Sequence, residues 1–426
     1  MDPVNSLRSF LDKAHSAYHA AALLKNELEQ AGYCRLQEGN NWEIKAGGKY
    51  YLMRNDSSLV AFRVPKGTPK GFLITASHTD RPSFKVKENA VLKGQYTRLA
   101  VERYGGMLIA PWLDRPLSVA GRVLVETENG IESRLVDIDR DLLLMPNVAI
   151  HMNRSANDGY KWNVATDTIP LLSDKKSTKQ FWDEVETLAG GKILGHDLYL
   201  YVRQNASVWG LENEFISAQA IDDLECAWGC LQGFLNASES GSVPMYCVFD
   251  SEEVGSRSVS GADSTMLTST MNRIARYLDT DLARMMAQSF LVSADNAHAI
   301  HPNHPELADP NNAPVMNGGI VVKFNASQRY TTDAVAAAVF RSVCNRAGVP
   351  TQTYYNRPDI PGGSTLGYVS LTHVSVPTAD IGLAQLAMHS CYETAGVQDS
   401  LYLEQAMTTY FSSTLTVTGD GESIIV

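Results

Sequence analysis

The sequence predicts an α/β fold with a central mixed sheet flanked by helices and an inserted β-rich domain. Three observations point to this class. Near both ends of the chain, apolar runs typical of buried strands alternate with stretches of helical periodicity. Between about residues 84 and 208, short strand patterns instead alternate with Gly, Asn and Asp turns. The chain has 426 residues, more than one hydrophobic core usually supports, so two domains are expected.

The expected elements follow in chain order. Leu7, Phe10, Leu11 and Ala14 recur at helical spacing and indicate a helical region over residues 6–31. The expected strands are 49–53, 59–64, 72–76, 99–101, 119–126, 198–202 and 245–249. The expected helices are 175–188, 224–235, 264–277, 279–288, 332–347 and 401–416. We therefore expect a discontinuous catalytic domain over residues 1–83 and 213–426, with residues 84–212 inserted into it.

Two adjacent glutamates, Glu252 and Glu253, follow the apolar run 245–249 where a strand runs out into a loop. In open α/β sheets, chemistry gathers at the carboxyl ends of the strands. Adjacent residues at a strand end point in different directions, so one glutamate can bind a metal while its neighbour handles a proton. A solvated acidic turn would be the ordinary alternative for such a pair.

Four other segments place histidine or aspartate beside apolar runs. Imidazole and carboxylate ligands suit borderline and hard divalent metals, and a shared carboxylate is typical of two-metal sites. A carboxylate near a metal-binding histidine can also hold its second ring nitrogen, which is a possible role for Asp80. The candidate ligands in these segments are His78, Asp222, Asp295 and His389.

Taken together, these segments resemble the aspartyl aminopeptidase family, whose members are dinuclear zinc metallo-exopeptidases of the same clan as leucyl and glutamyl aminopeptidases. The matching segments occur in family order over nearly the whole chain. They are residues 76–80, 112–123, 213–216, 221–224, 250–256, 293–303, 328–330 and 385–390. The resemblance implies one metal held by His78, Asp222 and Asp295, and a second held by Asp222, Glu253 and His389.

The same resemblance implies the reaction. Peptides with a free N-terminus would be hydrolysed by a water held between two divalent ions, with Glu252 as the general base and Asp80 as a supporting partner. Zn²⁺ is the expected metal, although Co²⁺ or Mn²⁺ also suit a carboxylate-rich site. Met388 and Gly363, the latter in the turn at residues 361–365, are expected beside the substrate.

The resemblance also implies an assembly. In the family the inserted domain makes a dimer contact, and six dimers form a hollow tetrahedral dodecamer. A histidine in the motif that contains His151 reaches the active site of the partner subunit. We therefore expect a homo-oligomer in which His151 acts in trans.

Ser327 is a departure from the family pattern. Relatives that prefer acidic N-terminal residues carry a lysine immediately before the Gln-Arg-Tyr motif, and here that position is serine. Serine cannot supply the charge that would pair with a substrate carboxylate. We expect neutral N-terminal residues to be accepted at least as well as acidic ones.

His298, His301 and His304 form the densest histidine cluster in the chain. Pro302 and Pro305 exclude a helix there, so the i, i+4 geometry of a zincin helix is not available. A structural or supporting role is expected for these histidines rather than metal ligation.

Charge and cysteine usage exclude several functions. The net charge of −11 argues against a nucleic-acid or anionic-membrane partner. The six cysteines form no Cys-x-x-Cys pair, which is typical of a reducing compartment. No apolar stretch is long enough to span a membrane, and residues 1–24 lack the apolar block of a signal peptide. A cytoplasmic enzyme is expected.

Two alternatives stay open at this stage. One is another dinuclear hydrolase of the same clan, such as a carboxypeptidase or an N-acyl deacylase. The other is a non-catalytic assembly or binding protein, against which the complete set of candidate ligands argues.

Overall fold

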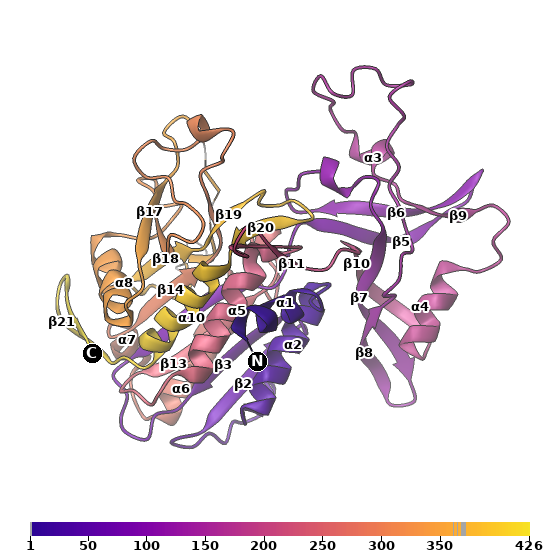
Figure 1. The fold of residues 1–426 in the computed structure, drawn as a ribbon. Helices are drawn as coiled ribbons and strands as arrows, with labels where there is room; N and C mark the ends of the chain where they lie inside the picture. Colours follow the sequence, from indigo (N-terminus) through magenta and orange to yellow (C-terminus); the bar gives the residue numbers. More distant parts are fainter. Residues whose placement is uncertain (1, 361, 364, 368–371) are drawn as a thin grey trace.

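A nine-stranded mixed sheet forms the centre of the larger part of the molecule, with helices on both faces (Figure 1). The computed structural model describes all residues except 1, 361, 364 and 368–371. In spatial order the strands are β1 (Cys34–Arg35), β2 (Lys49–Arg54), β3 (Ser58–Arg63), β13 (Val243–Phe249), β4 (Phe72–His78), β14 (Phe290–Ala294), β18 (Thr378–Gly382), β16 (Ile320–Phe324) and β17 (Thr351–Tyr355). The predicted α/β class with a mixed central sheet is confirmed.

Two hydrophobic cores lie on opposite faces of this sheet. Strand residues alternate between the faces, so neighbours such as Leu73 and Ile74 of β4 enter different cores. The helices over the first core are α1 (Pro3–Leu11), α2 (Ala17–Gln30), α5 (Ile221–Asn236), α8 (Ala334–Ala347) and α10 (Val397–Phe411). The helices over the second are α6 (Met266–Tyr277) and α7 (Leu282–Met286).

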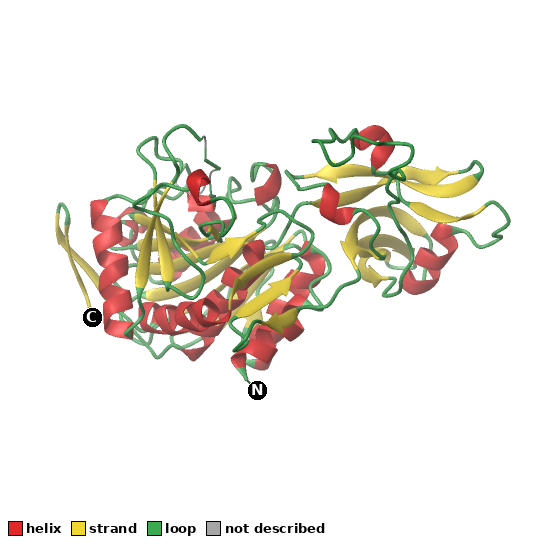
Figure 2. Cartoon of the chain, turned by 45° about the horizontal axis from the view of Figure 1, so that its top comes forward, coloured by secondary structure: helices red, strands yellow, loops and turns green. Residues whose placement is uncertain are grey.

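The chain leaves the central sheet after β4 and returns to it at β13. Between them it forms a separate six-stranded antiparallel sheet with its own core around Phe84, Val119 and Leu198 (Figure 2). In spatial order its strands are β8 (Gly130–Asp137), β7 (Leu117–Thr127), β10 (Ile193–Val202), β5 (Ser83–Leu92), β6 (Tyr96–Tyr104) and β9 (Leu171–Asp174). It also carries η1 (Ala110–Trp112), α3 (Val164–Asp167) and α4 (Phe181–Ala189). We call this part the inserted sheet unit.

A smaller five-stranded sheet contributes residues to the region beyond the central strands. In order it contains β11 (Ser207–Trp209), β12 (Phe215–Ala218), β20 (Glu393–Gly396), β19 (Ala384–Leu386) and β15 (Ala297–His298). The remaining short elements are η2 (Glu252–Val254), η3 (Pro305–Leu307) and the hairpin β21 (Leu415–Gly419) and β22 (Glu422–Ile425). Every helix among the described residues is too short or too polar to traverse a lipid bilayer.

Three of the expected helices differ most clearly from the observed ones. The helix expected over 175–188 is α4, which begins only at Phe181, because residues 175–180 form the loop after β9. The region 6–31 is two helices, because Ser16 is an N-cap whose hydroxyl accepts the backbone N–H of His19 and starts α2 anew. The helix expected over 401–416 begins earlier and ends at Phe411, after which the chain pairs as β21. The short strands of the five-stranded sheet carried too little periodic pattern to be predicted.

Candidate metal centre

Three neighbouring parallel strands place the candidate ligands at one edge of the central sheet. β4 lies between β13 and β14, and His78 at the end of β4 is directly opposite Phe249 at the end of β13. The 3₁₀ turn η2, with Glu252 and Glu253, follows β13, and Asp295 immediately follows β14. Because parallel strands end at the same edge, residues far apart in the sequence meet there.

Asp222 is the centre of this group. Its Oδ1 lies 3.3 Å from Nε2 of His78, and its Oδ2 lies 3.4 Å from Nε2 of His389. Nε2 of His389 also lies 3.4 Å from Oε2 of Glu253. Ligand atoms lie within 4.8 Å of one another in the set His78, Asp222 and Asp295 and in the set Asp222, Glu253 and His389. Asp222 belongs to both sets, with one carboxylate oxygen toward each histidine.

Asp80 links His78 to the Glu252–Glu253 turn. The backbone N–H of Glu252 donates to its Oδ1 at 3.1 Å, and that of Glu253 donates to its Oδ2 at 3.2 Å. Nδ1 of His78, the ring nitrogen that does not face Asp222, lies 3.1 Å from the backbone carbonyl of Asp80 and 3.5 Å from the same Oδ1. Asp80 therefore fixes the imidazole through its carbonyl and the turn that carries the two glutamates through its buried carboxylate.

The negative charge of the buried carboxylates at the site exceeds the positive charge of the side chains around them. Burial raises the pKa of Glu252 to about 8, and the carboxylates of Asp295, Asp80 and Asp222 add to this rise while His78 opposes it. Burial and the charge of Asp222 likewise raise the pKa of Glu253 well above its usual value. A bound divalent cation would relieve this repulsion.

A second observation indicates that these residues can hold divalent ions. Within the described residues, Oδ1 of Asp222 and Oε1 of Glu253 are buried and accept no hydrogen bond. Buried oxygens of this kind are costly unless they are paired or coordinate a metal. Two histidines and three carboxylates are also a ligand set that zinc accepts.

The inserted sheet unit closes one side of the site. At the end of β6, the hydroxyl of Tyr104 donates to Oδ2 of Asp80 at 2.7 Å. Gly105 follows with φ +76°, and a Cβ there would lie 3.1 Å from Cβ of Glu253. The backbone N–H of Leu108 donates to the carbonyl of His389 at 3.1 Å. Nothing in the sequence pattern indicated that this segment touches the site, because these contacts are made by one hydroxyl and by backbone.

A cavity of about 320 Å³ opens onto the ligands. His78, Asp222, Glu252, Asp295 and His389 lie in its wall, and so do Met388 and Gly363. Pro361 and Ser364 of the same turn lie outside the described residues. The cavity is also lined by His298, Lys323, Tyr330, Tyr354 and Thr365. His301 and His304 of the histidine cluster are exposed and are not among the described residues that line the cavity.

Lys323 is a cavity residue that sequence patterns missed. It is buried in strand β16, its Nζ donates to the carbonyl of Asn296 at 2.8 Å, and it lies 3.7 Å from Oδ1 of Asp295. A lone lysine within an apolar strand gives no signal of its own. Ser327, four residues later, is exposed on the following loop and is not among the described residues that line the cavity.

His151 lies in the exposed loop between β8 and α3, which projects from the inserted sheet unit near α3 in Figure 1. Within the described part of the chain, no hydrogen bond or ion pair joins it to the metal ligands of its own subunit. The structure of one subunit therefore brings together every predicted site residue except His151 and Ser327.

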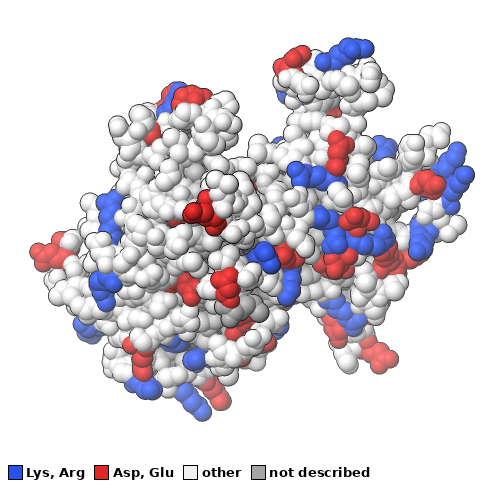
Figure 3. Space-filling view, in the orientation of Figure 1, with Lys and Arg blue, Asp and Glu red and all other residues white. Residues whose placement is uncertain are grey.

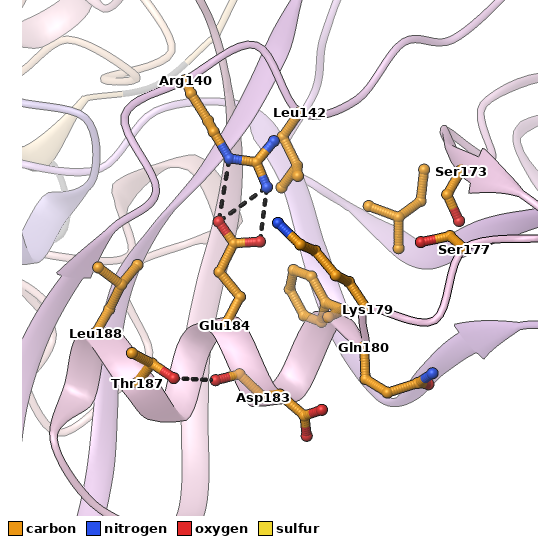
Figure 4. A pocket seen from close by; sticks show the side chains of 12 residues that line it. Arg140, Leu142, Ser173, Ser177, Lys179, Gln180, Asp183, Glu184, Thr187 and Leu188 are labelled. Carbon is orange, nitrogen blue, oxygen red and sulfur yellow. Dashed lines mark hydrogen bonds and ion pairs between the residues drawn. The ribbon is translucent and has the colours of Figure 1, made fainter.

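A larger hollow of about 710 Å³ lies in the inserted sheet unit beside α4 (Figure 4). Its wall includes an Arg140–Glu184 ion pair and the side chain of Lys179. None of the possible metal-ligand groups found among the described residues lies there. Acidic and basic side chains are interspersed on the face that Figure 3 shows, unlike the continuous basic stripe of a nucleic-acid-binding face.

This combination of an α/β sheet and a buried histidine–carboxylate cluster at its strand ends defines a metal-dependent hydrolase. The family described as Aminopeptidase I zinc metalloprotease (M18) matches residues 10–411. A probable M18 family aminopeptidase 2 of Clostridium novyi is 40% identical over 416 residues, covering 93% of this chain and 96% of the relative. The chain belongs to the M18 family of zinc aminopeptidases.

Solved structures agree with this assignment. A chain in the cryo-EM structure of the Ape4 and Nbr1 complex has a TM-score of 0.92 and 32% identity, covering 96% of this chain and 85% of the other. The structure of an S. cerevesiae mApe1 dodecamer gives a TM-score of 0.85 and 26% identity, with 96% of each chain covered. The resemblance predicted from the motifs is confirmed, and the enzyme is a zinc-dependent aminopeptidase rather than a carboxypeptidase, a deacylase or a non-catalytic protein.

Proposed function

We propose that this aminopeptidase holds two divalent ions per subunit, Zn²⁺ being the first choice and Co²⁺ or Mn²⁺ the possible substitutes. His78, Asp222 and Asp295 would hold one ion, and Asp222, Glu253 and His389 the other. The observation that carries the proposal is the position of Asp222, whose two carboxylate oxygens face the two histidines separately. When bound, the ions supply Lewis acidity, which lowers the pKa of water and polarises a carbonyl.

Glu252 is proposed as the general base. A third possible metal-ligand group contains His78 with both Glu252 and Glu253, so proximity alone does not separate the two glutamates. Glu252 lies in the wall of the cavity, whereas Glu253 faces His389. Asp80 fixes the backbone of both, so the carboxylate of Glu252 is held where it can take a proton from the attacking water and pass it to the leaving amine.

The proposed substrates are peptides with a free N-terminal amine, which the acidic cavity would attract. We expect neutral N-terminal residues to be accepted at least as well as acidic ones. Lys323 is a cation in the cavity wall, but its charge is already matched by Asp295 at 3.7 Å. Ser327 offers no charge in its place. An unpaired substrate carboxylate would pay a desolvation cost of several kcal/mol, on the order that buried polar groups show.

We also propose the wider organisation implied by the family. Residues 84–212 would form the dimerisation domain, and residues 1–83 with 213–426 the catalytic domain, which the separate hydrophobic cores support. The dodecamer formed by the relative mApe1 supports a dodecamer here, in which His151 would reach the site of a partner subunit. All six cysteines are free thiols, which supports a reducing compartment such as the cytoplasm.

A panel of chromogenic substrates tests the proposed function. Chelator-treated enzyme would be reloaded with Zn²⁺, Co²⁺ or Mn²⁺ and assayed on Leu, Ala, Met, Asp and Glu derivatives, alongside N-acylated versions of the same compounds. We expect hydrolysis only after metal addition, none of the N-acylated compounds, and kcat/KM for neutral residues equal to or above that for acidic ones. A wide preference for Asp would contradict the specificity proposal, and metal-independent turnover would contradict the mechanism.

A further inference from the structure

Glu393 is a buried carboxylate next to the site that takes no part in the proposed chemistry. It begins strand β20 and is 2% exposed. Its Oε2 accepts the backbone N–H of Asp222 at 3.0 Å, and its Oε1 accepts the backbone N–H of His389 at 2.7 Å. Asp222 and His389 are two of the three residues proposed to hold the second ion. One carboxylate therefore ties together two ligands that come from distant parts of the chain.

Both tethered segments have backbone conformations that need support. His389 has φ +65°, and Ala220, two residues before Asp222, has φ +56°. The left-handed region is unfavourable for residues with a Cβ, so such conformations persist only where surrounding contacts determine them. The hydrogen bond from the His389 N–H to Glu393 is a contact of this kind at the strained residue itself.

Arg81 supplies a positive charge to Glu393. Its two terminal nitrogens are buried and have no hydrogen-bond partner within the described residues. Arg81 and Glu393 line the same small internal cavity together with Asp222, and Arg81 directly follows Asp80 in the chain. The positive charge of Arg81 is thereby placed near the carboxylate that accepts both backbone N–H groups.

We propose that Glu393 is a positioning residue that sets the spacing of Asp222 and His389 and so determines the affinity of the second metal position. This inference rests on the two-ion assignment made above. Glu393 would take no part in proton transfer. Its contacts with the proposed ligands are with the backbone N–H groups of Asp222 and His389.

The test replaces Glu393 with Gln and measures metal binding directly. The amide keeps one acceptor oxygen but presents an NH₂ group where the other N–H is bound, so one tether is lost. Asp399→Asn is the matched control, because buried Asp399 also accepts two backbone N–H groups, from Asn317 at 2.6 Å and Gly319 at 2.8 Å. Chelator-treated proteins would be titrated with Zn²⁺ by calorimetry, and the bound metal counted by elemental analysis.

We expect Glu393→Gln to bind the second ion about 10–100-fold more weakly, the range seen for supporting partners of metal ligands. The first ion should lose less affinity, because Asp222 is the one ligand of that ion whose backbone N–H Glu393 accepts. Asp399→Asn should bind both ions as the wild type does, even if its melting temperature falls by as much as that of Glu393→Gln. If Glu393→Gln does not fold, Glu393→Asp gives the same test, because the shorter side chain cannot reach both N–H groups. Two ions bound at wild-type affinity in the Glu393 variant would overturn the inference, as would equal loss of metal in the control. Fewer than two ions in the wild type would instead overturn the two-ion assignment on which it rests.

Discussion

Glu252 and Glu253 are neighbours in the chain with separate surroundings. Both are fixed through their backbone by Asp80, yet only Glu252 lines the cavity, while Oε2 of Glu253 lies 3.4 Å from His389. At the scale of single residues, this divergence separates the proposed base from the proposed ligand.

Glu252→Gln should therefore keep both metal ions and lose nearly all turnover. Glutamine has almost the same shape but cannot take a proton, and loss of a general base costs on the order of 10²–10⁴-fold in rate. Elemental analysis and steady-state kinetics on the same preparation check this. Near-normal kcat with full metal content would remove Glu252 from the mechanism.

Asp222→Ala should empty both metal positions, whereas His389→Ala should empty mainly one. The reason is that Asp222 belongs to both ligand sets and His389 to one. The measurement is metal content per subunit after dialysis against buffer without added metal. Two ions retained in Asp222→Ala would show that its carboxylate does not bridge.

Three of the residues that sequence patterns identified share one property. His78 and the Glu252–Glu253 pair follow recognisable strands, so their meeting at one sheet edge could be predicted. Glu393 and Lys323 could not be found in this way. Glu393 acts on Asp222 across 171 positions of sequence through backbone N–H groups, and Lys323 lies within an otherwise apolar strand. Their roles depend on tertiary contacts that leave no periodic signal.

At the scale of elements, the end of β6 is the support that was not foreseen. It carries Tyr104 to Asp80 and places Gly105 against Glu253. The alternation of strands and helices predicted the central sheet well, because long periodic segments carry a strong signal. The contact between β6 and the site had no periodic signal in the sequence, because a glycine that packs against a metal ligand cannot be distinguished by sequence from a glycine in an ordinary turn.

Gly105→Ala should reduce metal content and activity together. A Cβ there would lie 3.1 Å from Cβ of Glu253, and φ +76° is unfavourable for alanine. Gly32→Ala is the matched control, since Gly32 has a similar φ of +83° and no atom within 4 Å of the added Cβ. Both variants should lose about 1 kcal/mol of stability from the backbone, but only Gly105→Ala should lose metal. Equal metal content in the two would contradict a supporting role for this turn.

At the scale of the whole molecule, the turn between α1 and α2 meets the inserted sheet unit through a polar contact. Nδ1 of His15 lies 2.6 Å from Oδ2 of Asp137 in β8, and the His15 ring stacks on Tyr201 of β10 with centroids 3.9 Å apart. His19 lies beside this group. Burial, opposed by the charge of Asp137 and helped by His15 and Arg81, lowers the pKa of His19 to about 4.

This depressed pKa predicts a loss of stability in mild acid. Between about pH 6.5 and 4, the unfolded chain protonates His19 while the folded chain keeps it neutral, so the free energy of unfolding falls as the pH falls. His19 is partly exposed, and we expect a contribution of about 2 kcal/mol after allowance for solvent screening. Urea unfolding of metal-free protein at several pH values should show a steeper fall for the wild type than for His19→Gln. Parallel curves would contradict this origin.

The assembly is the remaining property at this scale. The loop that carries His151 also exposes Val148 (51%), Ile150 (48%) and Met152 (80%), apolar side chains that a second copy of the chain would cover. We expect light scattering to give a dodecamer, and Ile150→Glu with Met152→Glu to reduce its size. Leu307→Glu, a change at a 55% exposed position in η3, is the control and should leave the assembly intact.

If His151 completes the site of a partner subunit, the dissociated double variant should keep its metal ions while kcat/KM falls at least tenfold. A stable monomer with full activity would contradict both the assembly and the role of His151 in trans.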